Sequence, residues 1–134
     1  MGDFTQAIIA FSAKTSDKMD RAARKIALDS FTSCIKISPV KHGRFRGNWQ
    51  PGIDAVPTGV LETLDPTGAI AIAATTEAIE GFGVGKVANL VNNLPYAIPL
   101  EDGHSDQAPA GMVGLTQQRM QPIADAVIAL IGRE

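Results

Sequence analysis

The chain has 134 residues, of which 45% are hydrophobic and 19% charged, and its net charge is −2. This length suits one domain (1–134), and the composition is that of a globular protein, which excludes a wholly disordered chain. The longest apolar stretches fall far short of the roughly 20 residues that cross a bilayer, and no signal-peptide pattern opens the chain. We therefore expect a cytosolic product with no membrane contact.

Charge is divided unevenly along the chain. Residues 1–46 carry nine basic and four acidic side chains, a net charge of +5, whereas the remainder carries three basic and ten acidic ones, a net of −7. Such polarity can place a basic face against the acidic face of a neighbouring subunit, or against nucleic acid. A basic helix face exposed to solvent beside an acidic second half explains it equally well.

Residues 1–37 are predicted to form a long amphipathic helix. No Gly or Pro occurs between Asp3 and Ile37, Asp3 is a suitable N-cap, and Ser38-Pro39 ends the segment. A second capping signal at residues 15–17 would allow a break there. The apolar positions repeat at spacings of three and four, which predicts one face packed on a core: Phe4, Ile8, Phe11, Thr15, Met19, Ala22 and Ile26.

The middle of the chain, 38–111, is predicted to hold a small sheet with an inserted helix. Residues 45–53 read as a strand interrupted at Pro51-Gly52, with a short strand at 60–64. Asp65-Pro66 resembles an N-cap followed by proline at the first helical position, so a helix is expected near 66–80. The alternation of Ala and Ile at 69–72 keeps a strand open as an alternative.

The second half is predicted to pass through a strand and an extended edge into a last helix. Residues 81–86 read as a flexible connector, 87–91 as a buried strand, 96–100 as an extended edge segment and 101–111 as a polar loop. Residues 112–134 carry an amphipathic helix, with Pro122 as a kink. The resulting fold class is α+β, with a long N-terminal helix and a C-terminal helix packed on a small antiparallel sheet.

Candidate catalytic and metal-binding residues are few. His42 and His104 belong to no two-histidine helical pattern, and a lone Cys34 is expected to be a buried hydrophobe, so we predict no metal site and no cofactor. Residues 101–106 contain the residue types of a hydrolytic triad. Neighbours in one loop point in different directions, however, and we expect no enzyme.

The glycine-rich segment 81–86 resembles a phosphate-binding loop only superficially. Glu80 stands where the pattern needs glycine, and Val87 stands where it needs Ser or Thr. The basic turn at 36–46 carries Lys41, Arg44 and Arg46, which could contact nucleic acid phosphates without sequence preference. A small non-specific nucleic-acid-binding protein is therefore the alternative function, although a solvated turn accounts for the same charges.

Two segments carry a resemblance to a known family. Residues 38–49 (SPVKHGRFRGNW) resemble the "(A/S)PV-x-x-G-x-(L/F)-R" turn of tailed-bacteriophage head-tail connector proteins of the neck or tail-completion type. Residues 91–97 (VNNLPYA) and 100–113 (LEDGHSDQAPAGMV) are similar to that family's "NN-x-PYA-x-x-LE-x-G" and "QAP-x-GMV" segments. The order matches over nearly the whole chain. Asp102 and the loop 52–67 depart from the pattern.

The resemblance implies a non-enzymatic minor tail component in the virion, assembled in the host cytoplasm. It implies a ring of identical subunits, expected to be hexameric, at the head-tail junction or the top of the tail (neck, tail completion or tail terminator), with neighbouring connector and tail proteins as partners. Basic side chains could then face DNA in the channel or another subunit. The residues expected to make these contacts are Lys41, Arg44, Arg46, Trp49, Tyr96, Leu100 and Met112.

Overall fold

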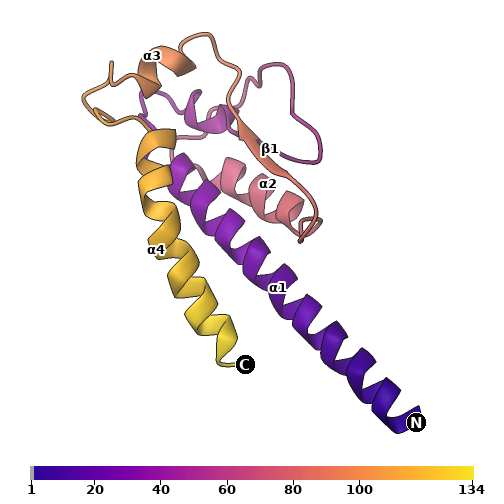
Figure 1. Cartoon of the computed structure of the whole chain (residues 1–134). Coiled ribbons are helices and arrows are strands. Elements are labelled where there is room, and N and C mark those ends of the chain that lie inside the picture. The colour runs from indigo at the N-terminus through magenta and orange to yellow at the C-terminus, as the bar shows by residue number, and fades with distance from the viewer. Residues whose placement is uncertain (1) are drawn as a thin grey trace.

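The computed structural model describes residues 2–134 and has an α+β fold, as predicted. Two long helices lie side by side, a shorter helix packs against the second half of the first helix, and a two-stranded sheet packs against that shorter helix (Figure 1). The elements are α1 (Gly2–Lys36), the 3-10 turn η1 (Arg46–Asn48), β1 (Gln50–Ile53), α2 (Ala69–Ile79), β2 (Ala88–Val91), α3 (Ala97–Glu101) and α4 (Val113–Gly132).

The predicted N-terminal helix is confirmed as one continuous helix of 35 residues. It begins at Gly2, one residue before the expected N-cap Asp3, whose side chain lies outside the described part. The break that the capping signal at 15–17 would allow is absent: the Thr15 hydroxyl donates to the carbonyl of Phe11 within the continuous helix and caps no new one. At the other end, the Ser38 hydroxyl donates to the carbonyl of Cys34 and covers the last turn.

Helix α4 runs antiparallel to the second half of α1. Arg119 near its start lies beside Ser33, and Glu134 at its end forms a 2.7 Å ion pair with Arg21. Pro122 lies inside α4, which continues past it to Gly132. Because α4 has 20 residues and α1 has 35, the first half of α1 extends beyond α4 (Figure 1).

The sheet is a single antiparallel pair, with Gln50 opposite Val91 and Ile53 opposite Ala88. The predicted strand at 45–53 is therefore half correct: its first part is the η1 turn, and Pro51 and Gly52 lie within β1 rather than interrupting it. A proline is tolerated because β1 has a neighbour on one side only. The strand predicted at 87–91 is confirmed from Ala88, although its side chains are only half-buried.

The strand predicted at 60–64 is wrong. Instead of pairing in a ladder, Leu61 pairs with the Asn48 side chain, whose amide donates to the Leu61 carbonyl and whose oxygen accepts from the Leu61 N–H. Asn48 is completely buried. One side chain therefore holds this loop where backbone pairing was expected.

The helix predicted at 69–79 is confirmed, and the strand alternative is wrong. Its start differs from the prediction, because residues 66–68 form a turn and Gly68 (φ 81°) precedes the first helical residue. Asp65 still caps the helix from further upstream, since its carboxylate accepts from the N–H groups of Ile70 and Ala71. This carboxylate satisfies orphan donors at the helix N-terminus.

The extended segment predicted at 96–100 is wrong, because residues 97–101 form the short helix α3. Pro99 does not prevent this, since it lies in the first turn, where a helix needs no N–H donor. The connector 81–86 is held against α1, where Arg24 donates to the Phe82 carbonyl and Asp20 accepts from the Val84 N–H.

The core lies where the second half of α1 meets η1, α2 and the start of α4. Its buried members include Ile35, Phe45, Trp49, Leu94 and Met112. Cys34 is buried among them, as predicted, and this burial raises the pKa of its thiol to about 12. No helix within residues 2–134 is both long and apolar enough to span a membrane.

Candidate functional site

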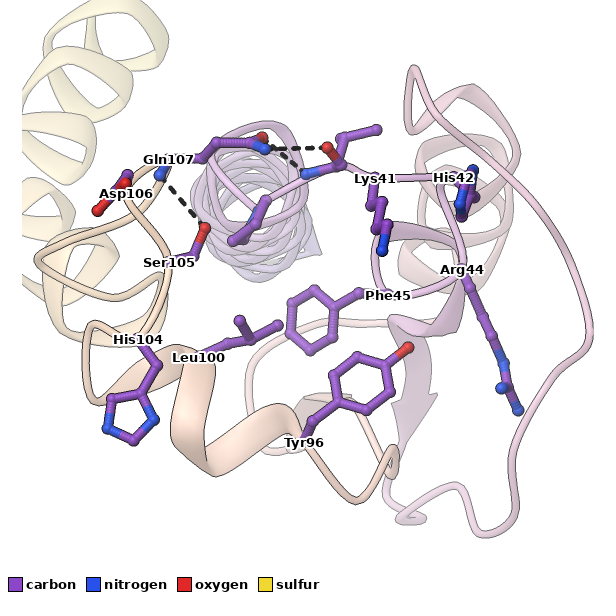
Figure 2. Close-up of a pocket in the computed structure, with 12 residues that line it drawn as sticks. Lys41, His42, Arg44, Phe45, Tyr96, Leu100, His104, Ser105, Asp106 and Gln107 are labelled. Carbon is purple, nitrogen blue, oxygen red and sulfur yellow. Dashed lines mark hydrogen bonds between the residues drawn. The ribbon is translucent and has the colours of Figure 1, made fainter.

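The two segments of the family resemblance form one continuous region of the structure. The Gln107 side chain makes two hydrogen bonds to the backbone of Val40, accepting from its N–H at 2.8 Å and donating to its carbonyl at 3.0 Å (Figure 2). The Asn92 side chain donates to the Phe45 carbonyl at 2.9 Å. Side chains of the second segment therefore fix the backbone of the first.

A surface pocket of about 670 Å³ lies between these segments. Phe45, Tyr96 and Leu100 meet at its centre (Figure 2). The rings of Phe45 and Tyr96 are 6.0 Å apart, and on its other side Phe45 packs edge-to-face on Trp49 at 5.7 Å. Such stacking makes a rigid apolar floor that suits an apolar side chain of a partner.

The rim of the pocket is mainly basic. Lys41, His42 and Arg44 line one side and are exposed, and Asp106 lies on the opposite side. Arg44 points outward from the pocket (Figure 2) and lies 3.8 Å from Glu62, an exposed pairing that contributes little to stability. The arrangement suits a partner surface that presents an apolar side chain beside a carboxylate.

Four of the predicted contact residues thus lie together at this pocket, namely Lys41, Arg44, Tyr96 and Leu100. The other three are directed into the protein. Trp49 and Met112 are buried core residues. Arg46 donates to the carbonyls of Lys36, Ser38 and Pro66, which closes the end of α1, and its burial lowers the pKa of its guanidinium. These three stabilise the fold and are not available to a partner.

Ser38 joins the first segment to the core, which gives a direct test of that segment's structural role. Its hydroxyl accepts from Trp49 Nε1 at 2.7 Å, and both groups are buried. Ser38→Ala leaves the indole N–H buried without an acceptor, so we expect a loss of about 1–3 kcal/mol in the free energy of unfolding. Urea titration measures it, and Ser12→Ala on the exposed face of α1 is the control, expected to change little. An equal effect of the two substitutions would contradict this role.

The loop 101–106, the strongest enzymatic hypothesis in the sequence, shows no converging side chains. His104, Ser105 and Asp106 point in different directions (Figure 2), and the Ser105 hydroxyl accepts from the Gln107 N–H. Within residues 2–134, no group of three or more His, Cys, Asp or Glu side chains is placed to hold a metal ion. We assign no chemical step to this loop.

Glu101, which the sequence analysis placed in that loop, has a structural role that the sequence alone did not show. Its carboxylate accepts from the N–H groups of Met112, Val113 and Gly114 at 2.9 Å each. It therefore caps α4 from α3. Partial burial alone would raise the pKa of Glu101, but the three N–H donors outweigh it and hold the pKa below its ordinary value.

Many basic side chains of the first third are engaged within the protein. Arg21 pairs with Asp17 and Glu134, Lys25 pairs with Asp29, and Arg24 and Arg46 bond backbone carbonyls. The net charge of +5 read from the sequence therefore does not form a fully free cationic surface.

No family model, no curated protein and no solved structure matches this chain.

Proposed function

We propose that the chain is a structural subunit of a tailed-phage virion that forms a ring at the head-tail junction or the top of the tail. The observation that carries this proposal is the union of residues 38–49 and 91–113 into one hydrogen-bonded unit through Gln107, Val40 and Asn92. Each of the two segments resembles the same family, and the two are also joined to each other by hydrogen bonds. These contacts support treating the two segments as one structural element.

Individual residues within the two segments of the resemblance also have identifiable structural roles. Gly43 has a φ of 87°, and Gly103 and Gly111 likewise have positive φ, a backbone conformation that favours glycine. Ser38, Asn48 and Glu101 bind backbone groups. These residues hold the backbone of the two segments in place, which supports a role as a structural subunit.

The pocket formed by Phe45, Tyr96 and Leu100 is proposed as the contact for a neighbouring connector or tail protein, with Lys41 and Arg44 at its edge. An apolar floor inside a charged rim is the usual composition of a protein interface. Arg46, one of the three residues expected to contact phosphates, is turned inward to backbone carbonyls, which gives less support to a nucleic-acid-binding function, so we do not propose it as a second function.

Native mass spectrometry of the purified full-length protein tests the proposal, alone and mixed with the products of adjacent genes. We expect a closed oligomer several-fold heavier than one chain, and its incorporation into a larger complex with a connector or tail protein. A monomer under every condition would contradict the ring. A DNA titration at rising salt is the parallel control, and tight, steeply salt-dependent binding by the free subunit would favour the nucleic-acid alternative.

A further inference from the structure

The first half of α1 is an arm, residues 4–17, that the described part of the chain leaves exposed, with Val84 beside Phe11 and Thr15 at its inner end. All of these residues are exposed, and the exposed fractions of Phe4, Ile8 and Phe11 are 69%, 50% and 69%. Their spacing of four and three residues places the three side chains on one helix face. Residues 4–13 contain no charged side chain. A continuous apolar surface of this kind marks an interaction site.

Helix α4 lies beside the second half of α1 only. Glu134, next to the end of α4, pairs with Arg21, and the arm extends beyond this point (Figure 1). The face that the sequence analysis expected to pack on a core therefore has a core partner in its second half only. Helices without tertiary packing are marginal in water, so a contact with another surface would stabilise the arm.

An apolar groove runs along that second half of α1. Two adjoining cavities of about 310 Å³ and 180 Å³ share Ser30, Phe31 and Met120. The α1 side chains that line them are Ala23, Ile26, Ala27, Ser30, Phe31 and Cys34. Met120 of α4 borders one side, and β2 borders the other. Ser30 and Cys34 form its buried floor, with exposed fractions of 3% and 4%, and the Ser30 hydroxyl has no hydrogen-bond partner among the described residues.

The groove and the arm match in length and in character. Residues 4–15 and residues 23–34 each span about 17 Å of helix, given a rise of about 1.5 Å per residue. The arm presents aromatic and aliphatic side chains, and the groove presents small and apolar ones. Because both surfaces lie on the same continuous helix, the arm cannot fold back into its own groove. The occupant must come from another molecule.

The area available is sufficient for a specific contact. An aromatic side chain buries about 150–250 Å², so the exposed apolar side chains of the arm would bury on the order of 500 Å². With a similar area from the groove, the contact reaches the roughly 1,000 Å² that a specific interface needs.

From these observations we infer that the arm of one copy of this chain docks in the α1–α4 groove of the next copy. The contact joins two different surfaces, so it is heterologous, and repeated copies close into a ring or extend as a filament. The inference rests on the proposed function in one respect, namely that the repeated contact closes.

A mixing experiment tests the two surfaces separately. The arm variant replaces Phe4, Ile8 and Phe11 with Gln, which keeps good helix propensity, and the groove variant is Met120→Lys. Met120 is 44% exposed, so both variants should fold, as circular dichroism and urea midpoints will show. Each alone is expected to be monomeric, with self-association weakened about a hundredfold or more. Mixed together, they should form one dimer and nothing larger, because only one intact arm and one intact groove can meet.

Disulfide trapping identifies the pairing directly. In a Cys34→Ala background, Ile8→Cys with Met120→Cys should give a ladder of cross-linked species on a non-reducing gel. Ile8→Cys alone should give none, and a cross-linked dimer there would show that two arms pair with each other and would overturn the inference. Val56→Cys with Met120→Cys is the matched control, because Val56 is at least as exposed as Ile8 (63% against 50%) but lies outside both surfaces.

The outcomes separate this inference from the proposed function. A ring that survives the arm and groove substitutions would overturn arm docking and leave the ring proposal standing. Open filaments that need both surfaces would support docking and contradict the ring. A wild-type monomer at every concentration would contradict both.

Discussion

Gly43→Ala is expected to lower the free energy of unfolding by about 3 kcal/mol or more, a large share of the 5–15 kcal/mol typical of a folded domain. Two costs combine at this position. Gly43 has a φ of 87°, where a side chain is strained. A Cβ there would also lie 2.6 Å from the carbonyl carbon of Asp65 and against the nitrogen of Pro66, which are backbone atoms that cannot turn aside.

Gly59→Ala is the matched control for this prediction. Gly59 has nearly the same φ, 86°, but a Cβ there meets nothing within 4 Å. Its substitution should therefore cost only the conformational strain, about 1–2 kcal/mol. Urea denaturation of both variants measures the difference. Equal losses would show that the turn at 38–49 relaxes around a side chain, contrary to the tight contact with residues 65–66.

The positions of the three longer helices, α1, α2 and α4, could be predicted because a helix is encoded locally, whereas the five-residue helix α3 was missed. The three-and-four spacing from Phe4 to Ile26 gave α1, and a capping aspartate and the Ala-rich run gave α2. The failures occur where a distant side chain decides the backbone conformation. Residues 60–64 have the composition of a strand, but the Asn48 side chain takes up the backbone groups of Leu61.

The candidate site was predicted in part, because the type of a residue indicates its chemistry but not whether its side chain points to the surface or into the protein. Lys41, Arg44, Tyr96 and Leu100 do gather at one pocket. Arg46 has the same charge as Arg44 and lies two residues away, yet it points inward to three carbonyls. Nothing in the local sequence distinguishes these two arginines, because the acceptors come from the end of α1 and from the loop before α2.

The exposure of the arm could have been inferred from the sequence, although not from periodicity alone. The spacing correctly predicts an apolar face, and a face of this kind was expected to be buried in its own core. The expected C-terminal helix is much shorter than the expected N-terminal one, so an antiparallel pair leaves one end of the longer helix bare. Comparison of helix lengths therefore separates the part of the face that builds the core from the part left for another molecule.

Glu101→Ala is expected to lower the free energy of unfolding by about 2 kcal/mol at neutral pH, the upper range for loss of a helix cap. The substitution removes the acceptor from three N–H groups at the start of α4, at Met112, Val113 and Gly114. A carboxylate is also favoured over a neutral group at this end, where the helix dipole is positive. Glu101→Gln keeps one acceptor oxygen and loses the charge, so its effect should be smaller.

The pH dependence of stability gives this prediction its sharpest test. Because the pKa of Glu101 is lower in the folded protein than in the unfolded chain, its contribution is fully present above the ordinary glutamate value of about 4.3. It is lost as the pH falls from there through the lower folded pKa. Urea midpoints of wild type and Glu101→Gln should therefore differ at pH 7 and begin to converge only as the pH falls below the ordinary glutamate pKa of about 4.3. Asp102→Asn is the control, since the neighbouring Asp102 is exposed and its carboxylate accepts no hydrogen bond among the described residues. If the gap between wild type and Glu101→Gln were constant across this pH range, the carboxylate charge would not be what holds the start of α4 against α3.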